Sequence, residues 1–501
     1  MYLRKKPNKS GSFSIQVIDK SSGRTRVVKT IGCSKDADEI NRLYKEGEKW
    51  IDERIGQATF DFTDNAIDKF LNNITDISIA GTSLILGKIY DEIGFNNIES
   101  NLLKYLVLTR LSHPASKLKT TDHLRQYYTV KINEDQIYRY LDKLYKDQKE
   151  QIQQISYEHT LKILGGIISI VFYDVTTLYF QIDDEDEIRK RGFSKEGKHQ
   201  NPQILLGLLV SIDGYPLAFD IFEGNKFEGH TMLPVLESFK QKYKLKKLVI
   251  IADSGLLSNK NIEELRQKGY EFILGARIKN ESYTVKEKIL SLSLKNGESQ
   301  VIEKEDGLKL IISYSEKRAK KDKYNRERGL KKLRKLLNVG KLTKANINNR
   351  GYNKYLKMQG DIEISIDEEK YEADARWDGL KGYLTNTSLT SDEIIENYGH
   401  LWKIEKAFRI SKHDLKVRPI YHRLQRRIEA HITINFIAYK VYKELERQLK
   451  EKKSGLSPEK VIEIAKTIYK VTVYDKSTNI LKEKVITLND QQRYLMKLFK
   501  T

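Results

Sequence analysis

Two aspartates lie in or directly after apolar segments, where burying a carboxylate is energetically unfavourable. Asp174 lies within the apolar, β-branched run that begins at Ile167, and Asp253 directly follows the apolar segment Leu248–Ala252. A carboxylate buried in a sheet costs several kcal/mol unless a cation meets it. Taken singly, each is better explained as a cap or turn residue at the end of a strand. Two central strands that bring an Asp to the same sheet edge would instead form a cradle for a hard divalent cation.

A third carboxylate is expected from a long helix that a capping box starts near residue 390. At 100° per residue, Tyr398, Glu405 and Lys412 fall on one face of this helix, within an arc of about 40°. Glu405 lies at the margin of the apolar stripe, where it can point into a site at the sheet edge. The alternative is an ordinary surface pair between Glu405 and Arg409, four residues further on.

Three converging carboxylates suit one chemistry in particular. Held around two Mg²⁺ or Mn²⁺ ions, they support in-line phosphoryl transfer on nucleic acid, in which one ion generates the nucleophile and the other stabilises the leaving oxygen. The carboxylates therefore predict metal-dependent cleavage or transfer of phosphodiesters.

The composition agrees with a nucleic-acid partner. The 501 residues include 90 Lys or Arg and 69 Asp or Glu, a net charge of +21. Such a surface favours a polyanion, with DNA or RNA as the leading candidate. At 39% hydrophobic residues the chain has ample material for folded cores, and its length excludes a single small module.

Several other classes are excluded. The single cysteine, Cys33, cannot form an internal disulfide, and no Cys pair lies near any of the nine His residues, which rules out a zinc finger. The longest apolar run, around Ile163–Phe172, is too short to span a membrane, and no signal-peptide pattern follows the N-terminal charges. We therefore expect a reduced, cytoplasmic protein with no membrane partner.

The elements before the first aspartate form an accessory region, residues 1–157. Alternating apolar residues over Phe13–Ile31 predict a β-hairpin, and Asp36–Ile55 predicts a helix. From Ile77 to Tyr157 the apolar spacing is largely helical.

A sheet begins with the buried strand predicted from Ile167 to Tyr173. Strands at Ile204–Val210 and Tyr215–Phe222 flank Asp213-Gly214, a strong hairpin signal. A helix, a strand, a second helix and a further strand follow, at His230–Tyr243, Leu248–Ala252, Asn259–Lys268 and Phe272–Ala276. The predicted order is βββαβαβ.

Residues 280–375 do not continue this alternation of strands and helices. β-like segments near Leu308–Tyr314 and Asp361–Ile366 enclose a helical stretch, Lys317–Lys344, that holds 13 Lys or Arg and two acidic residues. About half of the net charge therefore lies in this stretch, which is either a solvated helix face or a phosphate-binding surface.

Four motifs give the chain a family resemblance. They are Phe172–Phe180, Ile251–Gly255, Tyr398-x2-Leu401-x3-Glu405-x6-Lys412 and Arg418–His422. In this order the motifs resemble those of the DDE transposases of bacterial insertion sequences, in the insertion-sequence-four superfamily. The resemblance covers about residues 172–422.

The resemblance implies an α/β fold with an RNase H-like, mixed-sheet catalytic core formed by residues 158–279 and 376–425. A β-rich basic insertion, 280–375, interrupts this core. Residues 1–157 would be a mostly helical DNA-binding region that begins with the hairpin, and residues 426–501 a helical C-terminal region, starting with an amphipathic helix from Arg427 to Leu449.

The family pattern assigns Asp174, Asp253 and Glu405 as the catalytic triad that binds two Mg²⁺ or Mn²⁺ ions. Tyr398 and Lys412 would contact phosphates of the cleaved DNA end.

One position near the triad departs from the family pattern. Leu401 stands where the family commonly has Arg, and Arg409 or Lys403 are candidates to replace that contact. Trp402 and Trp377 are candidates to stack on an unpaired base, although a Trp beside a helix seam is more often a core residue.

The resemblance implies a transposase that cleaves DNA at transposon ends and transfers the strand into target DNA. Its partners would be double-stranded DNA with terminal inverted repeats, target DNA and a second copy of the chain in the DNA complex. Two alternatives stay open: an RNase H-like metal-dependent nuclease without strand transfer, and a catalytically inactive DNA-binding descendant.

Overall fold

The computed structural model describes residues 1–21, 23–55, 71–194, 197–245, 247–256, 258–304, 307–349, 351–359, 363–475 and 479–500. The chain divides into two compact units, Met1–Asp76 with Val471–Glu483 and Ile77–Lys470 with Lys484–Thr501. This division is coarser than the five segments expected from the sequence, and their boundaries stay predictions.

The first unit contains the predicted hairpin and helix. Strands β1 (Tyr2–Pro7), β2 (Phe13–Asp19) and β3 (Arg26–Ser34) form an antiparallel sheet in that order, followed by α1 (Ala37–Ile55). Buried Ile15, Ile40 and Leu43 join the sheet to the helix. Strand β1 was not predicted, because half of its residues are charged and they show no apolar alternation.

The predicted helical stretch up to residue 157 belongs to the second unit. It contains α3 (Lys88–Ile93), α4 (Asn101–Ser112), α5 (Lys117–Tyr128), α6 (Glu134–Lys143) and α7 (Lys149–Ile163). Ser100, Ser116 and Asn133 cap three of these helices, each accepting a hydrogen bond from a backbone N–H three residues later.

The second unit is built around an eight-stranded mixed sheet in the order β10-β11-β14-β9-β8-β5-β6-β7. Its central strands are β5 (Ile170–Tyr179), β8 (Val249–Ala252) and β9 (Glu271–Ala276), which are parallel. β6 (Gln203–Ser211) and β7 (Pro216–Glu223) continue antiparallel from β5. With α8 (Met232–Tyr243) and α9 (Asn259–Gln267) these elements confirm the predicted βββαβαβ order.

The start of the first strand was predicted wrongly. β5 begins at Ile170, and Ile167 is 70% exposed. Gly165 and Gly166, both with positive φ, turn the chain just before it, so the apolar run enters the sheet later than its composition suggests.

Residues on β5 alternate between two cores. Val171, Tyr173 and Val175 face the core that contains α8 and α9 residues. Phe172 and Leu178 face the other core, which contains residues of the helices near the C-terminal end of the chain. The sheet is thus covered on both faces, which explains why its strands are almost uniformly apolar.

The insertion is not mainly β, contrary to the sequence prediction. It contains α10 (Tyr283–Leu290), α11 (Glu316–Asn338), α12 (Glu368–Ala375) and the strands β10 (Ser299–Glu303), β11 (Lys309–Tyr314), β12 (Leu356–Gln359) and β13 (Glu363–Ile366). With 23 residues, α11 is longer than these four strands together. It ends before Gly340, whose φ is 62°, so the basic helix is shorter than predicted.

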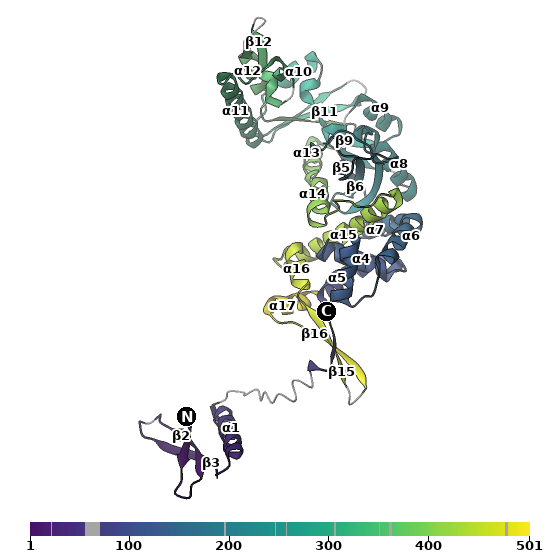
Figure 1. The fold of residues 1–501 in the computed structure, drawn as a ribbon. Helices are drawn as coiled ribbons and strands as arrows, with labels where there is room; N and C mark the ends of the chain where they lie inside the picture. The colour runs from purple at the N-terminus through teal and green to yellow at the C-terminus, as the bar shows by residue number, and fades with distance from the viewer. Residues whose placement is uncertain are drawn as a thin grey trace. The chain divides into compact units, whose positions relative to one another are not determined.

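The insertion is also part of the main sheet. β11 pairs with β14 (Leu380–Thr385), and β14 pairs with β9. A separate small core of Leu330, Leu333, Tyr355, Leu356 and Tyr371 holds α11 and α12 to β12. Figure 1 shows these elements grouped together, away from α15.

The helix predicted from residue 390 to 414 is interrupted. The capping box of Thr390 and Glu393 starts α13 (Ser391–Gly399) as predicted. α14 (Trp402–Arg409) follows after a short break at His400 and Leu401, directly after Gly399, and a π-helical turn, Ile410–Asp414, continues it. Glycine is a poor helix former, which is consistent with the break. Figure 1 shows α13 and α14 beside the central sheet, and α14 contacts β5.

The C-terminal region is only partly helical. α15 (Gln425–Glu451), α16 (Pro458–Ala465) and α17 (Asp490–Phe499) are helices, whereas β15 (Tyr469–Asp475) and β16 (Ile480–Ile486) are strands. These strands and β4 (Ile74–Ile79) form a sheet in the order β16-β15-β4. The sequence interpretation missed them because β16 is mostly exposed and shows little apolar alternation.

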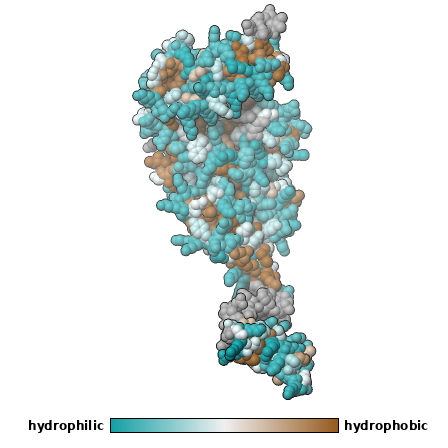
Figure 2. Space-filling view, turned by 90° about the vertical axis from the view of Figure 1, so that its left-hand side faces the viewer, coloured by the Kyte–Doolittle hydropathy of each residue, from teal (hydrophilic) through white to brown (hydrophobic). Residues whose placement is uncertain are grey.

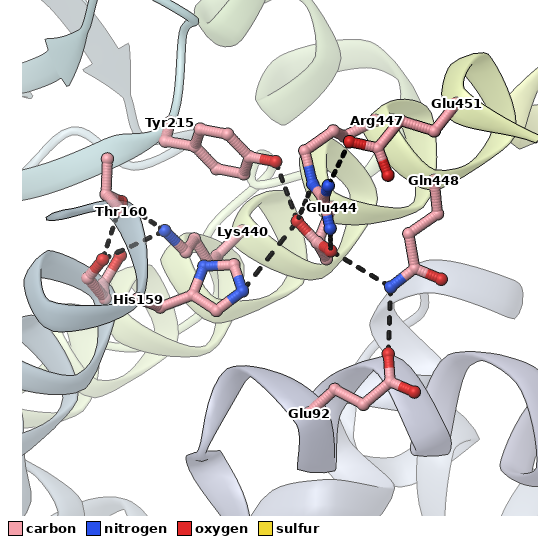
Figure 3. A network of polar contacts seen from close by, with 10 residues as sticks. Glu92, His159, Thr160, Tyr215, Lys440, Glu444, Arg447, Gln448 and Glu451 are labelled. Carbon is pink, nitrogen blue, oxygen red and sulfur yellow. Dashed lines mark hydrogen bonds and ion pairs between the residues drawn. The ribbon is translucent and has the colours of Figure 1, made fainter. Parts of the chain in front are cut away.

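A buried polar network ties α15 to its surroundings (Figure 3). Glu444, 2% exposed, accepts hydrogen bonds from the Tyr215 hydroxyl at 2.8 Å, the Arg447 Nε at 3.0 Å and the Gln448 Nε2 at 3.0 Å. Gln448 also donates to Glu92 of α3 at 2.9 Å. The network therefore joins α15 both to α3 and to the start of β7.

His159 at the edge of this network should make stability depend on pH. Its Nε2 lies 3.8 Å from Glu444. Burial and the charge of Lys440 lower the pKa of His159 to about 4, although Glu444 acts in the opposite direction. The unfolded chain, with a His pKa near 6.5, therefore binds more protons between pH 6.5 and 4. The free energy of unfolding should fall through this window by up to about 3 kcal/mol from this group, while above pH 6.5 the contribution is complete.

Urea unfolding of wild type and His159→Gln across this pH range measures the effect. The variant should lose less stability on acidification than wild type. His199→Gln, which changes an exposed residue, is the control and should decline as wild type does. Equal declines in wild type and His159→Gln would contradict the assignment.

Hydrophilic residues predominate on the face drawn in Figure 2, as expected for a chain of net charge +21. None of the described helices combines the length and the apolar character that crossing a bilayer requires.

Candidate active site

The strand register brings the two predicted aspartates to neighbouring positions. Tyr173 of β5 pairs with Ala252 of β8 in parallel register, so Asp174 and Asp253 take the next position on each chain segment. Side chains alternate across a strand, and the residues two positions earlier both face the core that includes α13 and α14. Asp174 and Asp253 are therefore expected on the sheet face that these two helices cover.

A cleft of about 440 Å³ joins two of the three predicted carboxylates. Asp253 and Glu405 are exposed and both line it, together with Tyr398. The Tyr398 hydroxyl donates a hydrogen bond to Oδ1 of Asp253 at 3.3 Å. Burial and the charge of Asp253 raise the pKa of Tyr398, so the phenol stays protonated. Asp174 is half-buried and does not line this cleft; its Oδ1 accepts the Val175 N–H at 2.8 Å.

Gly275 of β9 makes room for this arrangement. A Cβ at this position would lie 2.4 Å from the Tyr398 hydroxyl oxygen, closer than real contacts allow. Any larger residue would therefore displace Tyr398 from Asp253.

Two cations that the sequence interpretation missed line the same cleft, Lys381 of β14 and Arg318 of α11. The Lys381 Nζ lies 4.3 Å from the centre of the Tyr398 ring. Burial and Arg318 lower the pKa of Lys381, while the charges of Asp253 and Glu405 act in the opposite direction. Lys381 is thus within electrostatic reach of both carboxylates. The only sequence signal for either cation was the basic stretch that contains Arg318.

Of the flanking residues predicted from the helix, some line the cleft and others do not. Trp402 is 52% exposed and lines the cleft, so the alternative that it is a core residue is wrong. Arg409 and Lys412 do not line this cleft. The described contacts contain no ion pair between Glu405 and Arg409, so the alternative of a simple surface pair gains no support.

Leu401, at the position where the family commonly has Arg, is buried and lines the cleft. Lys403 cannot replace that Arg, because its Nζ donates to the Ile212 carbonyl at 2.6 Å and lies 3.8 Å from Asp213. The Lys403 side chain thus stabilises the turn between β6 and β7.

A second cleft of about 720 Å³ adjoins the first and shares Arg318 and Lys381 with it. Its wall comes mainly from the insertion and includes Trp377. Trp377 is half-buried, with the Lys279 Nζ 5.9 Å from its ring centre. The insertion thus adds a basic and aromatic surface beside the carboxylates.

The three carboxylates fit a divalent cation by their chemistry. They supply the oxygen ligands that Mg²⁺ and Mn²⁺ prefer, and Asp253 and Glu405 share one cleft. In the described part of the chain, however, no three His, Cys, Asp or Glu side chains are grouped closely enough to hold a metal ion. The donor types are in place, and the three side chains are not gathered around one point.

Comparison with known proteins gives one extensive match. A family model described as "Transposase DDE domain" matches residues 166–440, more than half of the chain, a segment that contains Asp174, Asp253 and Glu405. No curated protein matches the chain. One similar solved structure is a piggyBac transposase synaptic complex with hairpin DNA, at 11% identity, covering 80% of this chain and 79% of that chain, with a TM-score of 0.38. Another is a Mos1 transposase paired-end complex with the left transposon end, at 8% identity, covering 34% and 56%, with a TM-score of 0.16.

Proposed function

Since the chain belongs to the family of transposases with a DDE domain, we propose that it is the DNA transposase of an insertion sequence, in the insertion-sequence-four superfamily. It cleaves DNA at the ends of its element and joins those ends to target DNA. The observation that carries this proposal is the position of the carboxylates. Asp174 and Asp253 follow paired residues of parallel strands, and Glu405 shares a cleft with Asp253, all within the matched segment.

The catalytic core is proposed to be RNase H-like. The support is a mixed sheet in which β5 stands between antiparallel β6 and parallel β8. Acidic residues follow or lie on the two parallel strands, and the third comes from a helix packed on the same face.

Asp174, Asp253 and Glu405 would hold two Mg²⁺ or Mn²⁺ ions, which when bound activate the attacking hydroxyl and stabilise the leaving oxygen. Tyr398 orients the carboxylate of Asp253 through its hydroxyl. Because the scissile phosphate is anionic, Lys381 and Arg318 in the same cleft attract it and favour its approach.

Further DNA contacts are assigned to the surroundings of this cleft. Trp402 offers an exposed ring in the cleft wall on which a base can stack. Lys412 and Arg409 are proposed to contact phosphates outside it. The partners are duplex DNA with terminal inverted repeats, target DNA and a second copy of the chain in the complex.

The test is cleavage of a labelled duplex that carries the element's own end and flank, with Mg²⁺, Mn²⁺ or EDTA, followed by a strand-transfer assay. Metal-dependent cutting at the boundary, abolished by EDTA and followed by joining to target DNA, is the expected result. Cutting without joining would favour the nuclease alternative. Binding without cutting, with paired ends and either metal present, would favour the inactive DNA-binding alternative.

A further inference from the structure

A third cavity, of about 650 Å³, lies on the helical part of the second unit. This cavity, called the Arg110 pocket, is lined by Arg110, Lys117, Tyr138, Lys416, Arg418 and Tyr421, among other residues. The segment that closes it, residues 415–424, directly follows the helical turns that carry Glu405. Its volume falls within the range of small-ligand sites.

Two cations in this pocket are buried. Arg110 and Lys117 are each 5% exposed. The guanidinium of Arg110 donates to the carbonyl oxygens of Lys416 and Ala115, both at the long distance of 3.4 Å. The Lys117 Nζ has no hydrogen bond or ion pair with the described residues, and burial together with Arg110 lowers the pKa of Lys117 well below the usual range.

The pocket lacks the acidic groups that would balance this charge. Five Lys or Arg residues line it, against one acidic residue, Glu134. The carboxylate of Glu134 already accepts a hydrogen bond from the Tyr138 hydroxyl at 2.8 Å. Burying a cation without an anionic partner costs several kcal/mol, so in the free protein Arg110 and Lys117 lack the anion that would stabilise their charged forms.

An anion would remove that cost. Arg and Lys together recognise phosphate, through planar forked donors and a point charge respectively. Tyr138 and Tyr421 also line the pocket, and the Tyr421 side chain is 72% exposed. The cavity therefore offers buried phosphate donors next to one exposed aromatic ring, that of Tyr421, a combination typical of single-stranded nucleic-acid sites.

We propose that the Arg110 pocket binds a phosphate of the DNA strand, with the adjoining nucleotide against its tyrosines. This inference rests on the proposed transposase function, since DNA is the source of the phosphate. It adds a DNA contact outside the cleft of Asp253 and Glu405. Residues of the segment 415–424 line the pocket, and this segment follows α14 in the chain. A phosphate bound in the pocket would therefore contact a segment that is directly connected to the helix of Glu405.

The test compares DNA affinity, its salt dependence and folding stability in the full-length protein. Lys117→Met keeps the length of the side chain and removes its charge. Affinity for the labelled end duplex should fall about tenfold, and the slope of log K against log[salt] should decrease by about 0.9, the value for one lost phosphate contact. The urea midpoint of the free variant should stay the same or rise, because an unpaired buried cation has been removed.

Lys440→Met is the matched control. Lys440 is also fully buried, but its Nζ donates to the Ser156 carbonyl at 3.0 Å and it does not line the pocket. This variant should keep the salt slope and lose stability. Lys117→Arg should retain affinity and slope.

Unchanged affinity and slope in both Lys117→Met and Arg110→Gln would overturn the proposal, and would leave the transposase function intact if the wild type still cleaves its ends. A second experiment tests whether the pocket binds inorganic phosphate instead of DNA. If it raises the urea midpoint of wild type but not of Lys117→Met, while the DNA slope does not change, the pocket takes free phosphate and the DNA assignment is wrong. A wild type that neither binds nor cleaves end DNA would overturn both proposals.

Discussion

Replacing Asp253 with Asn should lower the rate of DNA cleavage at the element's ends by at least about a thousandfold, which corresponds to about 4 kcal/mol in the barrier. The variant preserves the shape of the side chain and removes its charge. Because Asp253 is exposed at the end of β8, folding stability should change little. Single-turnover cleavage with Mg²⁺ measures the effect. Binding of the same duplex should stay within about twofold, because phosphate contacts elsewhere position the DNA.

Tyr398→Phe provides the graded comparison for this experiment. It removes only the hydroxyl that donates to Asp253. A hydrogen bond to a charged group is worth about 1.5 kcal/mol, so cleavage should slow about tenfold. If Asp253→Asn retained more than a tenth of the wild-type rate, Asp253 would not be a catalytic carboxylate.

The largest effect on stability is expected from Glu444→Ala. The substitution leaves the Tyr215 hydroxyl and the Arg447 guanidinium without the carboxylate that both contact in the buried network (Figure 3). Leaving the buried Tyr215 hydroxyl without its acceptor costs about 1 to 3 kcal/mol, and Arg447 also loses the buried one of its two carboxylate partners. The urea midpoint should therefore fall sharply, with an unchanged midpoint contradicting the assignment.

Glu451→Ala is the matched control on the same helix. Glu451 also pairs with Arg447, but its side chain is 61% exposed. Exposed ion pairs contribute about 0 to 1 kcal/mol, so this variant should unfold close to wild type. A loss equal to that of Glu444→Ala would show that burial does not decide the contribution of these pairs.

The strands of the central sheet were predictable because their sequence signals are local. Each is a short apolar segment bounded by turn residues, and Asp213-Gly214 marks the hairpin between β6 and β7. The placement of Asp253 after β8 followed from the same pattern. The start of β5 was predicted three residues too early, because apolar composition alone does not tell where a strand joins its neighbours.

Other features depend on contacts that no local pattern records. Periodicity gave the shared face of Tyr398 and Glu405 but not the break after Gly399. Lys381 reaches the cleft because β14 pairs with β9, more than 100 residues earlier in the chain. Arg318 reaches it because α11 packs near the same strands. Whether the charge of the basic stretch faces solvent or a ligand is decided by this tertiary packing.

The position of α15 in the chain has a consequence for synthesis on the ribosome. Most residues of this 27-residue helix are buried, and they cover the core face that β5, β6 and β7 also supply. At about 5 to 20 residues per second, roughly 10 to 50 seconds separate the completion of β7 from that of α15. During this interval the nascent chain leaves exposed the part of this apolar face that α15 later covers, although the helices before β5 already pack on the same core. The cleft of Asp253 and Glu405 also cannot form until α14 has left the exit tunnel, because Glu405 lies on that helix.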